Sequence, residues 1–157
     1  MIRLVVNADD FGRSSGVNRG LFEAHDRGIV TSASLMVRYP AAAEAAALAR
    51  HRPRLGVGLH VDLGEWVYER DAWAAVYEVD APVEDALAQQ LDEFHRLLDR
   101  DPTHLDSHQH VHRRAPAHEH VVKLGHALVC PSATAIRASA TWATSMVSWR
   151  RASRWQS

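Results

Sequence analysis

Short apolar runs alternate with amphipathic stretches over the first 112 residues of the chain. Apolar, β-branched runs bounded by turn residues predict buried strands, and apolar positions repeated at a three-to-four spacing predict helices. The expected strands are 2–6, 29–37, 55–61 and 103–112, and the expected helices are 14–27, 41–50 and 82–100. This alternation of strands and helices predicts an α/β fold in which a parallel sheet is wrapped by helices.

The residues between these elements carry further expectations. Ser14 or Ser15 can cap the first helix, and we expect Gly28 to end it in the left-handed conformation. Residues 64–80 show no clear period and contain four aromatic side chains, Trp66, Tyr68, Trp73 and Tyr77. These rings are expected either to stack on sugar rings or to form a lid or a small secondary core under a long loop.

The most distinctive stretch is rich in histidine. Four of the chain's eleven histidines lie between His104 and His112. Because alternate residues of a strand face the same side, the predicted strand places on one face His104, Asp106, His108, His110 and His112. Imidazoles with a carboxylate and no nearby thiol are typical ligands of a zinc-type divalent metal. The alternative is a solvated histidine-rich loop with no ligand.

Other candidate ligands lie at the ends of other predicted strands. Asp9 and Asp10 follow the first strand, and His60 lies near the end of the third. Ligands of parallel α/β proteins bind at this carboxyl edge of the sheet. The alternatives are that an aspartate only caps the following turn and that His60 is purely structural.

Composition excludes several classes of protein. The chain of 157 residues is 46% hydrophobic and 24% charged, with a net charge of −1, so nothing favours nucleic acid or a membrane surface as a partner. No apolar run approaches the ~18 residues of a membrane span. The single cysteine, Cys130, excludes an internal disulfide and is typical of a reducing compartment, so we expect a cytoplasmic protein.

Four motifs in order resemble the YdjC family of carbohydrate deacetylases. They are VNADDFG at 6–12, GIVTS at 28–32, GVGLH at 56–60 and HLDSHQHVH at 104–112. The resemblance implies a distorted (β/α) barrel with one divalent metal ion, Mg²⁺ or Zn²⁺. It also implies removal of the acetyl group from an N-acetylated mono- or oligosaccharide.

The same resemblance implies roles for individual residues. Matched by position, the metal ligands are Asp10, His60 and His108, and Asp9 resembles the general base. Two histidines and one carboxylate leave a coordination position open for water, as in catalytic sites. His110 and His112 are candidates for the general acid because the predicted strand places them on the ligand face. Asp106 is better suited to orient an imidazole than to bind the metal.

The end of the chain departs from the family pattern. All 19 acidic residues lie in the first 119 positions. We therefore expect a deacetylase domain over 1–127 and an aberrant tail over 128–157, which is either frameshifted or disordered. Family members are longer, so the barrel is expected to be incomplete at its C-terminus.

An incomplete barrel changes the functional prediction. We expect impaired turnover for this chain. The alternative is a non-catalytic fragment that keeps metal or sugar binding, and a phosphoesterase is a third hypothesis with less support. A homodimer remains open.

Overall fold

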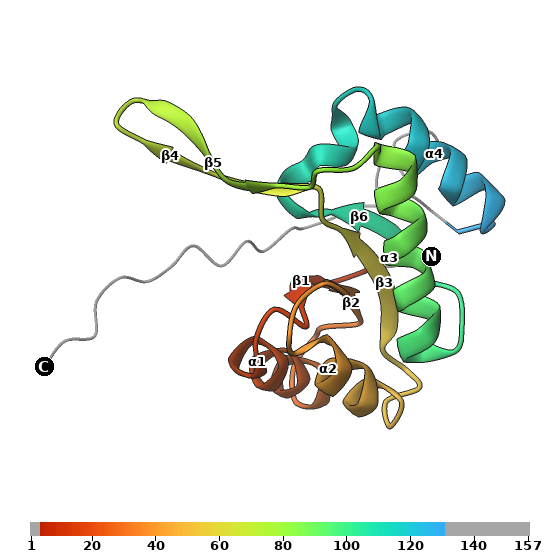
Figure 1. Ribbon diagram of the computed structural model, residues 1–157. Coiled ribbons are helices and arrows are strands. Elements are labelled where there is room, and N and C mark those ends of the chain that lie inside the picture. Colours follow the sequence, from red (N-terminus) through yellow and green to blue (C-terminus); the bar gives the residue numbers. More distant parts are fainter. Residues whose placement is uncertain (1–3, 131–157) are drawn as a thin grey trace, which may run out of the picture.

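The computed structural model describes residues 4–130, in which four strands form one parallel sheet (Figure 1). The spatial order of the strands is β1-β2-β3-β6. Their bounds are Asn7–Phe11 for β1, Ser32–Leu35 for β2, Gly56–Val61 for β3 and Leu105–Ser107 for β6. Because sequential strands lie side by side and run parallel, each connection must cross over the sheet, and a helix makes each crossover.

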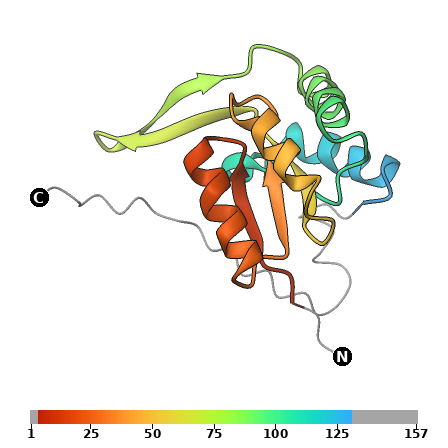
Figure 2. The ribbon, with the colours of Figure 1, turned by 90° about the horizontal axis from the view of Figure 1, so that it is seen from below.

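Four helices lie along the sheet. They are α1 (Ser15–Asp26), α2 (Ala42–Ala49), α3 (Val83–Leu98) and α4 (Ala117–Ala127). Ser14 caps α1 as expected, since its side chain accepts a hydrogen bond from the Val17 amide. Each helix contacts the next, as Figures 1 and 2 show for α1, α2 and α3. The predicted α/β fold with a barrel-like parallel sheet wrapped by helices is confirmed, as a partial barrel.

The core lies between the sheet and these helices. Phe11, Leu35, Leu59 and Leu105, one from each strand, are completely buried. Each such side chain contributes roughly 1.5–3 kcal/mol through removal of apolar surface from water. Four alanines of α2 are buried, and their small side chains let this helix pack closely against its neighbours α1 and α3.

Three local predictions are wrong. The first strand begins at Asn7, so residues 4–6 belong to no strand; residues 1–3 lie outside the described part. Pairing with β2 begins at Asn7, where the polar side chain is bonded to Ser32. Gly28 does not adopt a positive φ; a Cβ there would lie 2.6 Å from the Ala24 carbonyl oxygen, so close approach explains the glycine.

The histidine stretch is the third correction. Within this stretch Leu105–Ser107 forms a strand, and it ends there because its partner β3 ends at Val61, opposite Ser107. From His108 to Arg113 the chain forms a 3₁₀ turn in which Gln109 and His110 have positive φ values of 49° and 58°. The strict alternation expected from His104 to His112 therefore breaks after Ser107.

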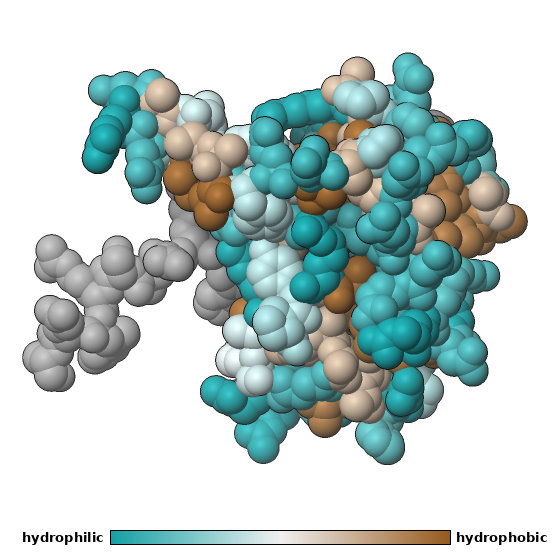
Figure 3. Space-filling view, viewed as in Figure 1, coloured by the Kyte–Doolittle hydropathy of each residue, from teal (hydrophilic) through white to brown (hydrophobic). Residues whose placement is uncertain are grey.

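Residues 64–80 form a β-hairpin instead of a patternless loop. Its strands are β4 (Gly64–Glu69) and β5 (Ala72–Glu78), and they extend away from the helices (Figure 1). Arg70 and Asp71 form the two-residue turn with positive φ, as a type I′ hairpin requires. In Figure 3 the hairpin carries hydrophobic surface beside hydrophilic residues, and Trp73 is 70% exposed. β5 is almost entirely exposed and β4 is only partly buried, so neither strand has the one-sided burial that produces a clear period, which explains why the sequence pattern missed them.

Between residues 4 and 130 no helix combines the length and the apolarity that a bilayer crossing needs.

Candidate metal centre

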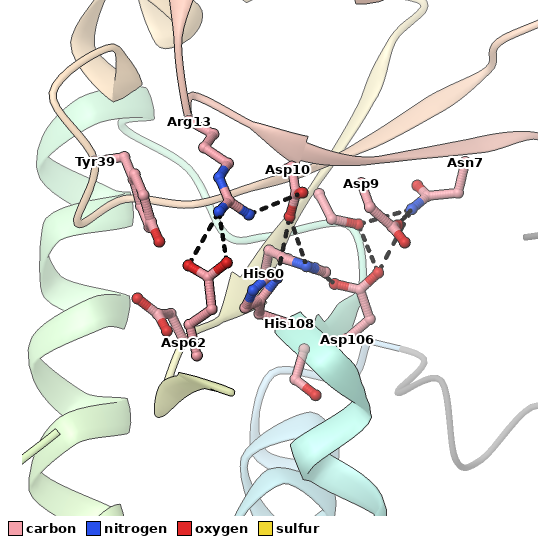
Figure 4. A network of polar contacts seen from close by, with 12 residues as sticks. Asn7, Asp9, Asp10, Arg13, Tyr39, His60, Asp62, Asp106 and His108 are labelled. Atoms are coloured by element: carbon pink, nitrogen blue, oxygen red, sulfur yellow. Dashed lines mark hydrogen bonds and ion pairs between the residues drawn. The ribbon is translucent and has the colours of Figure 1, made fainter. Parts of the chain in front are cut away.

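Three of the predicted ligands come from the carboxyl ends of parallel strands. His60 is the penultimate residue of β3, and His108 directly follows β6. Asp10 lies near the end of β1, where the pairing with β2 is irregular between Ala8 and Phe11. Its φ of 60° is unusual for a residue with a side chain, although aspartate tolerates it better than most. This break in the strand turns the Asp10 carboxylate toward the two histidines (Figure 4).

The three side chains converge on a common point. Asp10 Oδ1 lies 3.2 Å from His108 Nδ1 and 3.6 Å from His60 Nε2. One donor atom from each residue lies within 4.8 Å of the other two. Donors that share one zinc-type ion at about 2.0–2.2 Å are separated by roughly 3–4 Å, so the spacing suits a single cation.

Unpaired buried atoms supply an independent test of the fit. Asp10 Oδ1 and His108 Nε2 are buried and have no hydrogen-bond partner among residues 4–130. A buried carboxylate oxygen without a partner costs free energy that a bound cation would recover. The residues present therefore fit a divalent ion.

The second oxygen of Asp10 is held from the other side. Arg13 Nη1 lies 3.3 Å from Asp10 Oδ2. Burial opposes ionisation of Asp10, but His108, His60 and Arg13 outweigh it and leave the pKa of its carboxyl below the ordinary value. Asp10 is therefore an anion at neutral pH, as a metal ligand must be.

His60 is braced by Asp106. The Nδ1 of His60 lies 2.7 Å from Asp106 Oδ1, which leaves Nε2 facing Asp10. Burial disfavours both charges, but their mutual attraction outweighs it, so the pKa of His60 is raised and that of Asp106 is lowered. A carboxylate on the far nitrogen of a histidine fixes the ring and raises its basicity as a ligand.

Ser34, in the middle of β2, holds Asp106 in turn. The Ser34 hydroxyl donates to Asp106 Oδ2 at 2.7 Å and accepts from the Asn7 amide at 2.8 Å. His104 Nε2 lies 3.1 Å from the same hydroxyl. Because a hydroxyl has one proton and Asp106 takes it, His104 must donate through Nε2. The ring of His104 packs over Gly58, where a Cβ would lie 2.5 Å from it.

A second set of acidic and imidazole groups overlaps the first. Donor atoms of Asp9, His60 and Asp106 also lie within 4.8 Å of one another. Asp9 and Asp106 already accept hydrogen bonds from Asn7 and Ser34, whereas Asp10 Oδ1 accepts none from the described residues. This difference favours Asp10, His60 and His108 as the place for the cation.

Asp9 lies beside the candidate metal centre but groups with His60 and Asp106, and not with Asp10 and His108. Asn7 Nδ2 donates to Asp9 Oδ1 at 2.9 Å. Burial and the neighbouring Asp106 carboxylate raise the pKa of Asp9 above the ordinary value, although His60 and Asn7 act in the other direction. A carboxylate of raised pKa is a stronger base than an exposed one.

His110 and His112 do not share the face that the predicted strand gave them. His110 is exposed, whereas His112 is buried with Nδ1 at 2.6 Å from the Ser107 hydroxyl. Burial lowers the pKa of His112 to about 4. The two imidazoles therefore differ in access to solvent.

The sequence did not single out Asn7, Arg13 or Ser34. Asn7 belongs to the first motif, and its polar side chain at the start of a strand is a signal in hindsight. Ser34 lies in the predicted second strand, where a completely buried hydroxyl needs a polar partner. Arg13 gave no signal, because its partner Glu65 lies in a hairpin that the sequence pattern did not predict.

The fold and the site define a class: a partial α/β barrel with a carboxylate and two imidazoles at the carboxyl edge of its sheet. The sequence model described as "YdjC-like protein" matches residues 3–156. The chain therefore belongs to the YdjC-like family.

Named relatives agree with this assignment. The chain is 43% identical over 124 residues to a carbohydrate deacetylase of Geobacillus stearothermophilus; the match covers 69% of this chain and 49% of the relative. It is 40% identical over 131 residues to a chitooligosaccharide deacetylase of Enterobacter sp. (strain 638), with 69% and 50% covered. The chain thus spans about half the length of these curated relatives.

A solved structure supports the fold. The crystal structure of a proposed cellobiose-phosphate cleavage protein from Enterococcus faecalis V583 superposes on this chain with a TM-score of 0.66 at 28% identity. The superposition covers 83% of this chain and 58% of that one.

Proposed function

We propose that this chain derives from a metal-dependent hydrolase that removes the acetyl group from N-acetylated mono- or oligosaccharides. The observation that carries the proposal is the unpaired, buried Asp10 Oδ1 facing His60 and His108. The deacetylase names of the relatives supply the substrate class.

One divalent ion is the proposed cofactor. Two imidazoles and one carboxylate suit Zn²⁺ better than Mg²⁺, which prefers oxygen ligands, so we expect zinc to bind more tightly. When bound, such an ion polarises an acetamide carbonyl and lowers the pKa of a water. Asp10, His60 and His108 would hold it.

Asp9 is the proposed general base. Its raised pKa makes the carboxylate a stronger proton acceptor than an ordinary one. Asn7 holds one of its oxygens, so the other is available to take a proton from the attacking water. Asp9 and Asp10 thus have separate roles, because the irregular backbone between Ala8 and Phe11 sends the neighbouring carboxylates to different partners.

The departing sugar amine requires a proton donor. With a pKa of about 4, His112 carries no extra proton at neutral pH, so its imidazolium form is not available. Of the two candidates named from the sequence, this leaves His110, which is exposed to solvent. We propose His110 as the general acid.

The experiment is acetate release from N-acetylated chitooligosaccharides by the purified chain with zinc. Because the chain spans about half of its relatives, we propose turnover far below that of a longer family member assayed in parallel. Asp9→Asn should abolish the remaining turnover and leave zinc binding intact. Full turnover in Asp9→Asn would contradict the role of Asp9.

The alternative function is a non-catalytic fragment that retains metal or sugar binding. Bound zinc with no acetate release from any acetylated sugar would favour the fragment. Acetate release at the rate of a longer relative would exclude both the fragment and the expected impairment. The proposed tail over 128–157 lies almost entirely outside the described residues, and resequencing the gene would decide whether its reading frame is intact.

The single cysteine, Cys130, supports a reducing, cytoplasmic location as part of the same proposal.

A further inference from the structure

Glu65 and Trp66 form the root of the β4–β5 hairpin, next to the sheet. They contact the segment that carries Asp10 and the segment that carries His108. Arg13 Nη2 lies 2.8 Å and 3.0 Å from the two carboxylate oxygens of Glu65, in β4. The other terminal nitrogen of Arg13 contacts Asp10 Oδ2. One guanidinium therefore joins a proposed metal ligand to the hairpin.

Trp66, the next residue of the hairpin, is bonded to Gln109, the neighbour of the proposed ligand His108. Gln109, directly after His108, accepts a hydrogen bond from the Trp66 amide at 3.0 Å and donates to the Trp66 carbonyl at 2.8 Å. Its side-chain amide pairs with the hairpin backbone as a strand neighbour would. Glu65 and Trp66 are thus hydrogen-bonded to two separate segments, one carrying Asp10 and the other His108.

Both segments contain a residue whose backbone conformation is unfavourable without stabilising tertiary contacts. Asp10 and Gln109 have φ values of 60° and 49°, which residues with side chains rarely adopt. Such conformations persist where surrounding contacts over-determine them. The bonds to Glu65 and Trp66 are contacts of this kind.

The hairpin has one further anchor that avoids the proposed ligands. The Tyr77 hydroxyl donates to the buried Asp62 carboxylate, at 2.8 Å from each oxygen, and also lies 3.0 Å from the Tyr39 hydroxyl. Beyond its root the hairpin is exposed, as Tyr68 and Trp73 show. A substitution at Tyr77 therefore loosens the hairpin from a side that does not contact Asp10 or Gln109, although the ring of Tyr39 also lies against the Arg13 guanidinium.

We propose that Arg13 and Gln109 are positioning residues that hold Asp10 and His108 for the metal by fastening them to the root of the β4–β5 hairpin. The inference rests on the proposed metal site. Arg13 occupies Asp10 Oδ2, so Oδ1 is the oxygen left for the cation. By reciprocity, an ion that favours this arrangement also favours the docked hairpin, so zinc binding stabilises the Glu65 and Trp66 contacts.

Charge alone predicts the opposite effect of Arg13. A guanidinium near a divalent cation repels it, so removal of Arg13 should tighten zinc binding if the residue acts only through its charge. If Arg13 positions Asp10, its removal should weaken zinc binding. The sign of the change separates the two roles.

The experiment measures zinc affinity by isothermal titration calorimetry on the full chain and its variants. Arg13→Met and Gln109→Ala should each weaken zinc binding about 10-fold, the lower end of the loss seen when a group that orients a ligand is removed. Glu65→Gln should weaken it less, because Arg13 keeps its contact with Asp10. Arg96→Met, the matched control, removes an exposed arginine that pairs with Glu93, and it should bind zinc like the wild type.

Hydrogen exchange supplies a readout independent of activity. Zinc should slow exchange of the Trp66 amide in the wild type and in Arg96→Met, and much less in Arg13→Met. Circular dichroism checks that each variant is folded, and Arg13→Lys replaces Arg13→Met if the latter does not fold. Lysine keeps the charge but cannot span both carboxylates with a fork of donors.

The outcomes separate this inference from the proposed function. Wild-type or tighter zinc binding in both Arg13→Met and Gln109→Ala would overturn the positioning role and leave the metal site standing. A wild-type chain that binds no zinc would overturn the proposed metal site, and this inference would fall with it.

Discussion

The candidate metal centre is built differently on its two sides. His60 is braced from within the sheet, where Asp106, Ser34 and Asn7 form a buried chain of hydrogen bonds. Asp10 and His108 lie at breaks in regular structure and are held by contacts to a protruding hairpin. The first side is fixed by the same pairing that makes the fold, whereas the second depends on an element that the core does not support.

The two sides should differ in how rigidly they hold their metal ligands. Buried networks with every partner satisfied are stiff, because any movement leaves a polar group unpaired. Contacts at a hairpin root are partly exposed, as the 30% exposure of the Arg13 side chain shows, and water can replace them. We therefore expect substitutions on the His60 side to cost stability as well as metal affinity, and those on the hairpin side to cost mainly affinity.

The largest expected effect is loss of a ligand. His60→Ala should weaken zinc binding at least about a hundredfold, which is the upper end of the loss caused by removing even an outer partner of a ligand. Metal content after dialysis, measured by mass spectrometry, checks it. His95→Ala is the control, because His95 pairs with Asp101 on the surface. Equal occupancy in His60→Ala and the wild type would remove His60 from the ligand set.

Next in size is the carboxylate behind His60. Asp106→Asn keeps the shape but offers an amide hydrogen where His60 Nδ1 needs an acceptor, so zinc affinity should fall about 10- to 100-fold. Titration calorimetry measures the change, with Asp101→Asn as the surface control. An unchanged affinity would mean that the ring of His60 is fixed without Asp106.

Removing the hydroxyl of Ser34 should have a smaller effect. Ser34→Ala leaves the buried Asp106 short of one donor, which should lower the free energy of unfolding by about 1–3 kcal/mol. Urea denaturation measures this loss. Ser14→Ala, which removes the cap of α1, should cost about 1 kcal/mol with no change in zinc affinity. If both variants bind zinc equally well, Ser34 is a stability residue alone.

The His60–Asp106 pair also predicts a pH dependence of the metal-free chain. The raised pKa of His60 contributes stability below its ordinary value of 6.5, and this is lost as pH rises through the raised value. The lowered pKa of Asp106 contributes stability above 3.8, and this is lost as pH falls through the lowered value. Urea unfolding in the presence of a chelator should therefore show that the contribution of the His60–Asp106 pair to the free energy of unfolding declines at alkaline pH. Asp106→Asn should flatten that decline, and an unchanged slope would contradict it.

The smallest effect is expected at the hairpin tip. Trp73→Ala should change the free energy of unfolding by no more than about 0.5 kcal/mol and leave zinc affinity unchanged, because the ring is 70% exposed. The same variant tests the predicted stacking role. Weaker binding of an N-acetylated oligosaccharide would support stacking on Trp73, and unchanged binding would remove it.

Much of the sheet could be predicted from the sequence. The strand–helix order and the ends of α1, α2 and α3 follow from local patterns, since each helix has one apolar face and a polar or proline-bearing start. The convergence of Asp10, His60 and His108 also follows, because parallel strands bring their carboxyl ends to one edge. Local pattern and global fold agree in these parts.

The remainder depends on contacts between distant segments. The turn after Ser107 could not be read from alternating histidines, because β3 ends opposite that residue and Gln109 binds the backbone of Trp66 instead. The positive φ of Asp10 and the ion pair of Arg13 with Glu65 likewise depend on tertiary contacts with the hairpin. Alternation describes a strand only while a partner strand continues beside it.

Anomalous diffraction from zinc-loaded crystals would locate the ion itself. We expect one strong peak within about 2.0–2.2 Å of Asp10 Oδ1, His60 Nε2 and one ring nitrogen of His108. A peak held by Asp9 and Asp106 instead, or no peak among these side chains at full zinc loading, would contradict it.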